Sequence, residues 1–147
     1  RRWDVHRDPH EGPAALADYL ADTGAGLMWL AARARGAPDA AEATVRAYGW
    51  AAAAATYIRA VPELSARGRQ PIPEGLTLED LARRGLEKLA KARASRKVVP
   101  KEIAPALLAG WQAESLLDQV IAGRSLPELS EARKRWALMW QALSGRW

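Results

Sequence analysis

Alanine and leucine dominate this sequence and constrain its fold more than any other feature. The 147-residue chain holds 32 Ala and 18 Leu against 6 Val and 4 Ile. Ala and Leu lose little free energy on entering a helix, whereas β-branched residues are the ones enriched in strands. We therefore expect an all-α fold of about five helices. The length fits a single domain over residues 1–147.

Proline and glycine residues indicate where these helices begin and end. Pro62 is expected to end the second helix, because proline cannot continue a helix interior, and 62–75 is expected to be an ordered loop. Thr77 is expected to cap the third helix, with acidic residues in its first turn. The periodicity predicts helices over residues 13–35, 39–60, 78–96 and 100–123, and a fifth that begins at Pro127.

Apolar side chains recur at helical spacing along these segments and predict the core. The alanine run 51–55 offers little side-chain volume, so it permits a close helix approach or leaves a cavity beside it. The residues expected to be buried are Leu27, Leu30, Tyr48, Ile58, Leu107 and Trp111. The tryptophans expected in the core are Trp29, Trp50, Trp111 and Trp136, while Trp140 and Trp147 are candidates for an interface.

Composition excludes several functional classes. The chain has no Cys and only two His, which leaves no thiolate nucleophile and too few ligands for a structural zinc site. His6 and His10 lie in no catalytic motif and are expected in a mobile start. The net charge of +5 is interpreted as a solvated basic face, without nucleic acid as a partner, because no nucleic-acid-binding motif accompanies it. A basic module for membrane surfaces or nucleic acid stays a third hypothesis, supported by the net charge only.

No apolar stretch of the sequence reaches the length that crosses a bilayer, which is roughly 18 to 20 residues. The first residues also lack an apolar signal core. We therefore expect a cytoplasmic protein, with peripheral attachment to the inner face of a membrane left open.

The segment 56–73 carries the most specific pattern in the chain. The residues of this pattern are Arg59, Arg67, Gly68, Arg69 and Pro73. Their spacing resembles the second aspartate-rich region of the squalene/phytoene synthase family, where Asn-x-x-Arg-Asp-x-x-x-Asp leads to Arg-Gly-Arg-x-Tyr-Leu-Pro. Upstream, Tyr19 and the small residues 23–26 are similar to a Leu-x-x-Tyr and small-residue helix of that family. The resemblance implies an isoprenoid-synthase-type helical bundle, of which this chain would be the C-terminal half.

Departures from the family pattern point away from catalysis. In the family's enzymes the two aspartates of this motif bind magnesium, which neutralises the diphosphate leaving group; here Ala60 and Leu64 occupy those positions. Neither side chain offers the oxygen donor that a hard divalent cation needs. Glu63 is the nearest carboxylate, and one residue of displacement rotates a helical side chain by about 100°. We therefore expect no catalytic residue, no metal ligand and no cofactor in this chain.

A shorter pattern indicates a non-catalytic role. The segments 59–62 and 92–108 are similar to the branch of the family that acts in respiratory complex I assembly. This resemblance implies a binding or assembly protein with a protein partner, or self-association, through an apolar helix face, and an isoprenoid or anionic lipid as ligand. The alternative is an active prenyltransferase of the phytoene or squalene synthase type. It would condense prenyl diphosphates head to head and hold magnesium through aspartates upstream of this chain.

Three arginines dominate the candidate binding site and are expected to converge on one mouth of the bundle. Like charges converge only if an anion or a carboxylate lies between them. A carboxylate from Glu63, Glu74 or Glu79 would make the cluster structural, which is the outcome we favour, whereas a phosphate, diphosphate or lipid head group would make it a binding site. The candidate substrate-binding residues are Tyr19, Thr23, Arg59, Glu63, Arg67 and Arg69.

Overall fold

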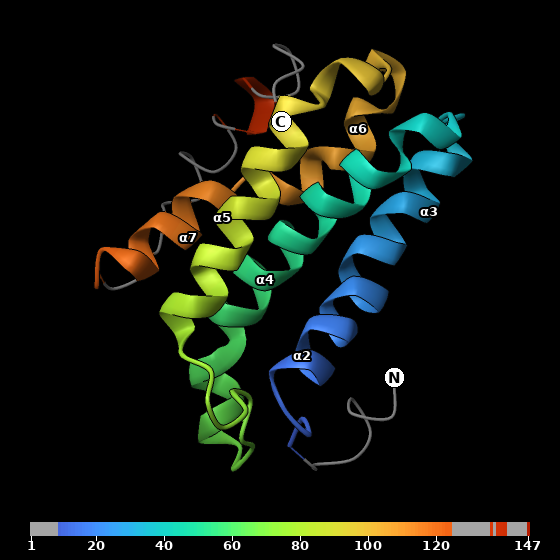
Figure 1. The fold of residues 1–147 in the computed structure, drawn as a ribbon. Coiled ribbons are helices and arrows are strands. Elements are labelled where there is room, and N and C mark those ends of the chain that lie inside the picture. Colours follow the sequence, from blue (N-terminus) through green and yellow to red (C-terminus); the bar gives the residue numbers. More distant parts are fainter. Residues whose placement is uncertain (1–8, 125–135, 137, 141–146) are drawn as a thin grey trace.

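The computed structural model describes residues 9–124, 136, 138–140 and 147 and is a bundle of helices (Figure 1). This part of the chain forms no strand, so the expected all-α class with about five helices is confirmed. Helix α4 (Glu42–Ala66) lies in the middle, with the first helical run on one side and α5 (Leu78–Ala94) on the other. Among the helices described, none is long and apolar enough to cross a membrane.

The first helical run contains a π turn at its centre. Helix α2 (Pro13–Leu20) continues into the π-helical segment η1 (Ala21–Ala25), and then into α3 (Gly26–Ala34). The junction residues Leu20 and Gly26 both keep right-handed helical dihedral angles, so the expected helix over 13–35 is continuous. It ends at Ala34, and Gly36, whose φ is 85°, supplies the left-handed turn that follows.

Helix α4 passes through Pro62, so the expected end of the second helix before that residue is wrong. Proline removes one backbone hydrogen bond, but its fixed φ is compatible with helical geometry. Leu64 packs against the core and favours continuation of the last turn. The helix ends instead at Ala66, and Gly68, with a φ of 74°, supplies the left-handed turn that follows. There the amide of Gly68 donates to Ser65 at 2.9 Å and that of Arg69 donates to Leu64 at 3.1 Å.

Helix α5 begins at the cap that the sequence predicts. The amide of Asp80 donates to Thr77 Oγ1 at 3.0 Å, and the amide of Thr77 donates to Asp80 Oδ2 at 3.4 Å. This reciprocal capping box satisfies amides at the helix start that have no partner within the helix. The short 3₁₀ turn η3 (Arg96–Val98) follows the helix.

The expected single helix over 100–123 is broken into pieces. The pieces are η4 (Lys101–Ile103), α6 (Ala104–Leu107), η5 (Leu108–Gly110) and α7 (Ala113–Ile121). Gly110 lies against the buried ring of Tyr48, where an added Cβ would be 2.6 Å from Cε1. The chain at this point therefore follows the surface of α4 instead of a regular helical path.

The core forms where α4 meets its neighbours. Trp50 on α4 donates from its indole nitrogen to the carbonyl of Ala17 on α2 at 3.1 Å. Arg93 on α5 and Glu114 on α7 form a two-pronged ion pair, in which Nη2 to Oε2 is 2.8 Å. The largest fully buried side chains are Leu16, Leu20, Val45, Tyr48, Leu81, Ile103, Leu107 and Leu117.

The burial predictions are confirmed on α4 and α6 and wrong on α3. Tyr48, Ile58 and Leu107 are buried as expected, whereas Leu27 is 49% exposed and Leu30 is 64% exposed. Helix α3 buries a face made of Met28, Trp29 and Ala32. Leu27 and Leu30 lie outside that contact, because α3 is at the side of the described bundle (Figure 1).

The tryptophan predictions also divide. Trp29 and Trp50 are buried as expected, and Trp111 is half-buried. Trp136 is 68% exposed, so its expected place in the core is wrong. Trp147 is only 6% exposed, because its ring packs edge-on against Tyr48 at 5.0 Å. Most of the expected fifth helix, which begins at Pro127, lies outside the described residues.

Candidate functional site

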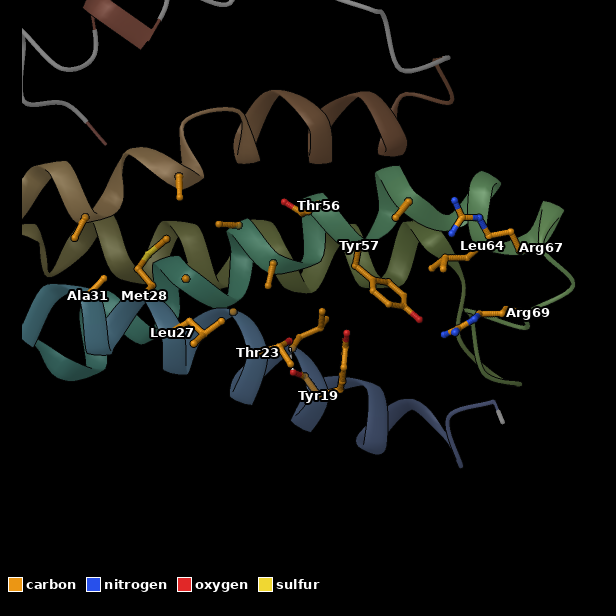
Figure 2. Close-up of a pocket in the computed structure, with 18 residues that line it drawn as sticks. Tyr19, Thr23, Leu27, Met28, Ala31, Thr56, Tyr57, Leu64, Arg67 and Arg69 are labelled. Atoms are coloured by element: carbon orange, nitrogen blue, oxygen red, sulfur yellow. Dashed lines mark hydrogen bonds between the residues drawn. The ribbon is translucent and has the colours of Figure 1, made fainter. Parts of the chain in front are cut away.

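A cavity of about 850 Å³ lies between the first helical run and α4 (Figure 2). Its volume falls in the range of about 300–1,000 Å³ that is typical of ligand pockets. Leu27, Met28 and Ala31 lie at one end, and Arg67 and Arg69 lie at the other (Figure 2). Most of the other lining residues are alanines, glycines and Leu20. The cavity is therefore apolar along most of its length and cationic at one end.

Two glycines set the position of the cavity by letting the helices touch. A Cβ on Gly24 would lie 2.1 Å from the Cβ of Ala53, and one on Gly49 would lie 2.9 Å from the Cα of Ala25. The backbones of η1 and α4 therefore meet directly at this crossing. The small side chains of Ala52 and Ala53 leave space beside it. Both expectations for the alanine run, close approach and an adjacent cavity, are met.

The π turn supplies part of the cavity wall. Thr23 lies inside η1, and its hydroxyl donates to the carbonyl of Tyr19 at 2.6 Å. A π turn is often found at functional sites. Here it places Tyr19, Thr23 and Gly24 on the same wall.

Aromatic rings close the polar end of the cavity. The Tyr57 ring lies 6.1 Å from that of Tyr19 and 6.2 Å from that of His10, and the His10 and Tyr19 rings are 5.2 Å apart. The Tyr57 hydroxyl donates to the carbonyl of Pro71 at 2.6 Å. Burial raises the pKa of Tyr57 above its usual range, with nearby Tyr19 adding to this shift and Arg69 opposing it. Tyr57 is therefore a neutral donor that holds the loop after α4.

The two arginines at the mouth are positioned by the end of α4. Arg67 is the last residue before the left-handed turn at Gly68, and Arg69 follows that turn. Arg67 forms an ion pair with Glu63 one helical turn earlier. Arg69 is half-buried, and its side chain extends toward Tyr57 (Figure 2). The cationic end of the cavity is thus formed by local structure at the C-terminus of α4.

The structure brings together four of the six candidate residues. Tyr19, Thr23, Arg67 and Arg69 all line the cavity. Glu63 lies beside them on the exposed side of Arg67 and does not line it.

Arg59 is placed elsewhere, on a second cavity of about 380 Å³ beside Trp111 and Gln112. The expected convergence of three arginines therefore includes only two of them. Since α4 continues beyond Pro62, Arg59 is about 12 Å from Arg67 along the helix axis. Glu79, one of the carboxylates considered as a partner for the cluster, pairs with Arg83 on α5 instead.

Sequence reasoning missed two contributors to the site. Tyr57 lies inside the segment 56–73 but is not among the predicted site residues. Its position two residues before Arg59 is the only sequence feature that could have indicated a role in the site. His10 does not project into solvent as a mobile start would, because it is 9% exposed and packs on Tyr19. His6 lies outside the described residues.

The residues around the cavity do not fit a magnesium ion. Ala60 and Leu64, at the positions of the metal-binding aspartates in the family pattern, both line the cavity, and neither has an oxygen donor. Across the described part of the chain, no three His, Asp or Glu side chains are grouped in a way that could hold a metal. No family model, curated protein or solved structure matches this chain.

Proposed function

We propose that this chain is a squalene/phytoene synthase-like protein that binds a long-chain amphipathic molecule without catalysing its condensation. The observation that carries this proposal is the polarity of the 850 Å³ cavity, which is apolar along its length and ends at Arg67 and Arg69. A molecule with an apolar chain and an anionic head matches both parts of that surface.

The apolar part of the cavity favours a hydrocarbon chain. Leu20, Leu27 and Met28 line it together with alanine and glycine residues. Each Å² of apolar surface removed from water contributes about 25 cal/mol, so a chain that covers these residues gains free energy in proportion to its length. Leu27 is 49% exposed, so a bound chain would cover apolar surface that otherwise faces water.

The cationic end of the cavity favours an anionic head. Guanidinium groups present paired N–H donors that match carboxylate and phosphate oxygens. Tyr57 and Tyr19 stand next to these donors and shape the entrance. An anion at this point would lie beside the side chains of Arg67 and Arg69.

Replacement of the metal ligands supports a non-catalytic role. In the family pattern two aspartates would hold magnesium against a diphosphate, and Ala60 and Leu64 stand in their places along this cavity. Without that neutralisation the leaving group of a condensation is not stabilised. The alternative is an active prenyltransferase completed by upstream aspartates, which would use the same apolar cavity. Turnover of prenyl diphosphates distinguishes this alternative from our proposal.

The proposed cellular role is that of a binding or assembly factor for a protein partner. The resemblance of the sequence to the complex I assembly branch supports this role. The exposed Leu27 and Leu30 on α3 form an apolar helix face beside the cavity. Such a face supports a protein partner or self-association. We place the protein in the cytoplasm, with attachment to the inner face of a membrane through its lipid ligand.

The test combines binding with turnover. The protein is titrated with geranylgeranyl compounds by calorimetry, and incubated with farnesyl or geranylgeranyl diphosphate and magnesium while diphosphate release is followed. We expect binding without turnover. Thr56→Trp, which fills the cavity from an exposed position on α4, should abolish binding, while Ala43→Trp, exposed on the same helix outside the cavity, should leave it intact. Diphosphate release by the unmodified chain would establish the enzymatic alternative.

A further inference from the structure

The cavity of about 380 Å³ beside Arg59 takes no part in the function proposed above, although its volume falls in the range of ligand pockets. One wall is the face of α4 that carries Ala55 and Arg59, and the other is formed by residues 109–113 and by Leu116 on α7. The residues that line both this cavity and the larger one are Ala52, Thr56 and Ala109. The two cavities therefore adjoin, but their other side chains differ.

Arg59 supplies the charge of the smaller cavity. Among the described residues that line it, Arg59 is the one charged side chain. It is exposed on α4, and within the described part of the chain it forms neither an ion pair nor a side-chain hydrogen bond. Glu63, one helical turn later on α4, is paired with Arg67 instead. The N–H donors of the Arg59 guanidinium are therefore available to an anionic ligand.

An indole ring and an amide accompany this guanidinium. Trp111 and Gln112 both line the cavity, and both are half-buried. A tryptophan ring offers a flat apolar surface on which another ring can pack. The Gln112 side chain can donate and accept hydrogen bonds, and it does not cap α7. The remaining lining residues are apolar, apart from Thr56, so the cavity joins a flat apolar surface to one cation and one amide.

We propose that the smaller cavity is a second binding site and that its ligand is a small planar aromatic carboxylate. The two carboxylate oxygens accept hydrogen bonds from the planar fork of Arg59, and the ring packs against Trp111 and Leu116. An inorganic anion would leave that apolar surface uncovered. The site does not depend on the ligand of the larger cavity, because neither Arg59 nor Trp111 lines that cavity.

The test titrates the whole chain by calorimetry with naphthoate and three related probes. Naphthamide has the same rings without the charge, decahydronaphthoate has the same carbon skeleton without the flat rings, and inorganic phosphate is an anion without a ring. We expect naphthoate to bind about tenfold more tightly than naphthamide, as charge-assisted hydrogen bonds provide. It should bind about fivefold more tightly than decahydronaphthoate, as packing between aromatic rings provides. Inorganic phosphate should bind at least about tenfold more weakly than naphthoate.

Substitutions of the lining residues locate the bound probe. Arg59→Gln should weaken naphthoate binding about tenfold and leave naphthamide binding as it was. Arg67→Gln removes the same charge from the end of the same helix, at the mouth of the larger cavity, and should change neither. Trp111→Leu should remove the preference for naphthoate over decahydronaphthoate, whereas Trp111→Phe should keep it. Because Arg59 is exposed, its variant should unfold at the same temperature as the parent chain.

Several results would overturn the second site. One is no binding of naphthoate by the unmodified chain, and another is equal binding of naphthoate and naphthamide. Loss of naphthoate binding in Arg67→Gln but not in Arg59→Gln would place the probe in the larger cavity. Phosphate that binds as tightly as naphthoate would show that the ring is not recognised. None of these results bears on the function proposed above, which is tested with geranylgeranyl compounds in the larger cavity.

Discussion

At the scale of single residues, two glycines two positions apart in the first helical run have opposite roles. Gly24 touches α4, where an added Cβ would lie 2.1 Å from the Cβ of Ala53. Gly26 has ordinary space, because the nearest atom to an added Cβ would be the carbonyl oxygen of Ala21 at 3.4 Å. Replacement by alanine would therefore clash with α4 at Gly24, whereas the added methyl group would have room at Gly26.

We expect Gly24→Ala to lower the free energy of unfolding by about 1–3 kcal/mol, because the two helix backbones must separate. Gly26→Ala should raise it by about 0.5–1 kcal/mol, because alanine is the better helix former. Urea denaturation of the two variants and the parent chain measures both effects. A loss of stability in Gly26→Ala as large as that in Gly24→Ala would contradict the assigned helix crossing.

The ion pair between Arg93 and Glu114 predicts a dependence of stability on pH. The hydrogen bond from Arg93 lowers the pKa of Glu114 below its usual value, against a smaller opposing effect of burial. A depressed folded-state pKa contributes stability that is complete above the unfolded value and is lost as the pH falls through the folded value. Because both side chains are nearly half exposed, the contribution is at most about 1 kcal/mol.

Glu114→Gln should therefore be less stable than the parent chain at pH 7, and the difference should be smaller at pH 3, which is below the usual pKa of a glutamate of about 4.3. The measurement is the urea midpoint of both proteins at the two pH values. Glu79→Gln, which alters an exposed pair within α5 alone, controls for general loss of negative charge. A difference as large at pH 3 as at pH 7 would mean that Glu114 stabilises the fold through something other than its charge.

At the scale of elements, α4 shows how a helix continues through a residue that ordinarily ends one. Pro62 lies inside the helix, four residues before its last residue. An interior proline removes one backbone hydrogen bond and introduces a steric conflict with the preceding turn. The helix nevertheless reaches Ala66, because Leu64 packs on the core and the left-handed turn at Gly68 satisfies the final carbonyl groups.

Pro62→Ala should therefore raise the free energy of unfolding by about 1–3 kcal/mol, because it restores the missing bond and removes the conflict. Thermal and urea unfolding provide the measurement, and binding of geranylgeranyl compounds reports whether the cavity keeps its shape. A destabilised variant, or one that has lost binding, would indicate that the fold needs the local geometry that proline imposes.

At the scale of the whole molecule, an apolar face on α3 remains uncovered by the described fold. Leu27 is 49% exposed and Leu30 is 64% exposed, and Leu27 also lines the cavity. Apolar surface that extends from a cavity to the outside of a helix bundle favours contact with a second surface. The proposed partner or second copy would cover this face.

We expect the protein to self-associate in sedimentation experiments at micromolar concentration, and Leu30→Glu to shift it toward the monomer without loss of helical content. Ala90→Glu, which introduces the same charge at an exposed position on α5, should leave association unchanged. If the unmodified chain stays monomeric, the face is available for a different partner, and self-association through it is ruled out.

The features that could be predicted from the sequence depend on local chemistry. The abundance of Ala and Leu indicated helices, Thr77 marked the start of α5, and Ala60 and Leu64 ruled out the oxygen ligands of the resembled magnesium site. Each of these inferences depends on residues within one or two helical turns. Propensities, caps and ligand types act at that range, so they can be read in order along the chain.

Which side chains meet depends on how the helices pack, and this could not be predicted along the chain. The cavity lies beside the point where Gly24 contacts α4. The ring of Tyr48 packs against Gly110, where the helix that periodicity predicts over 100–123 is broken. The continuation of α4 past Pro62 separates Arg59 from Arg67 and Arg69. Packing between segments distant in sequence outweighs local preference at these points, because each depends on the space that another helix leaves.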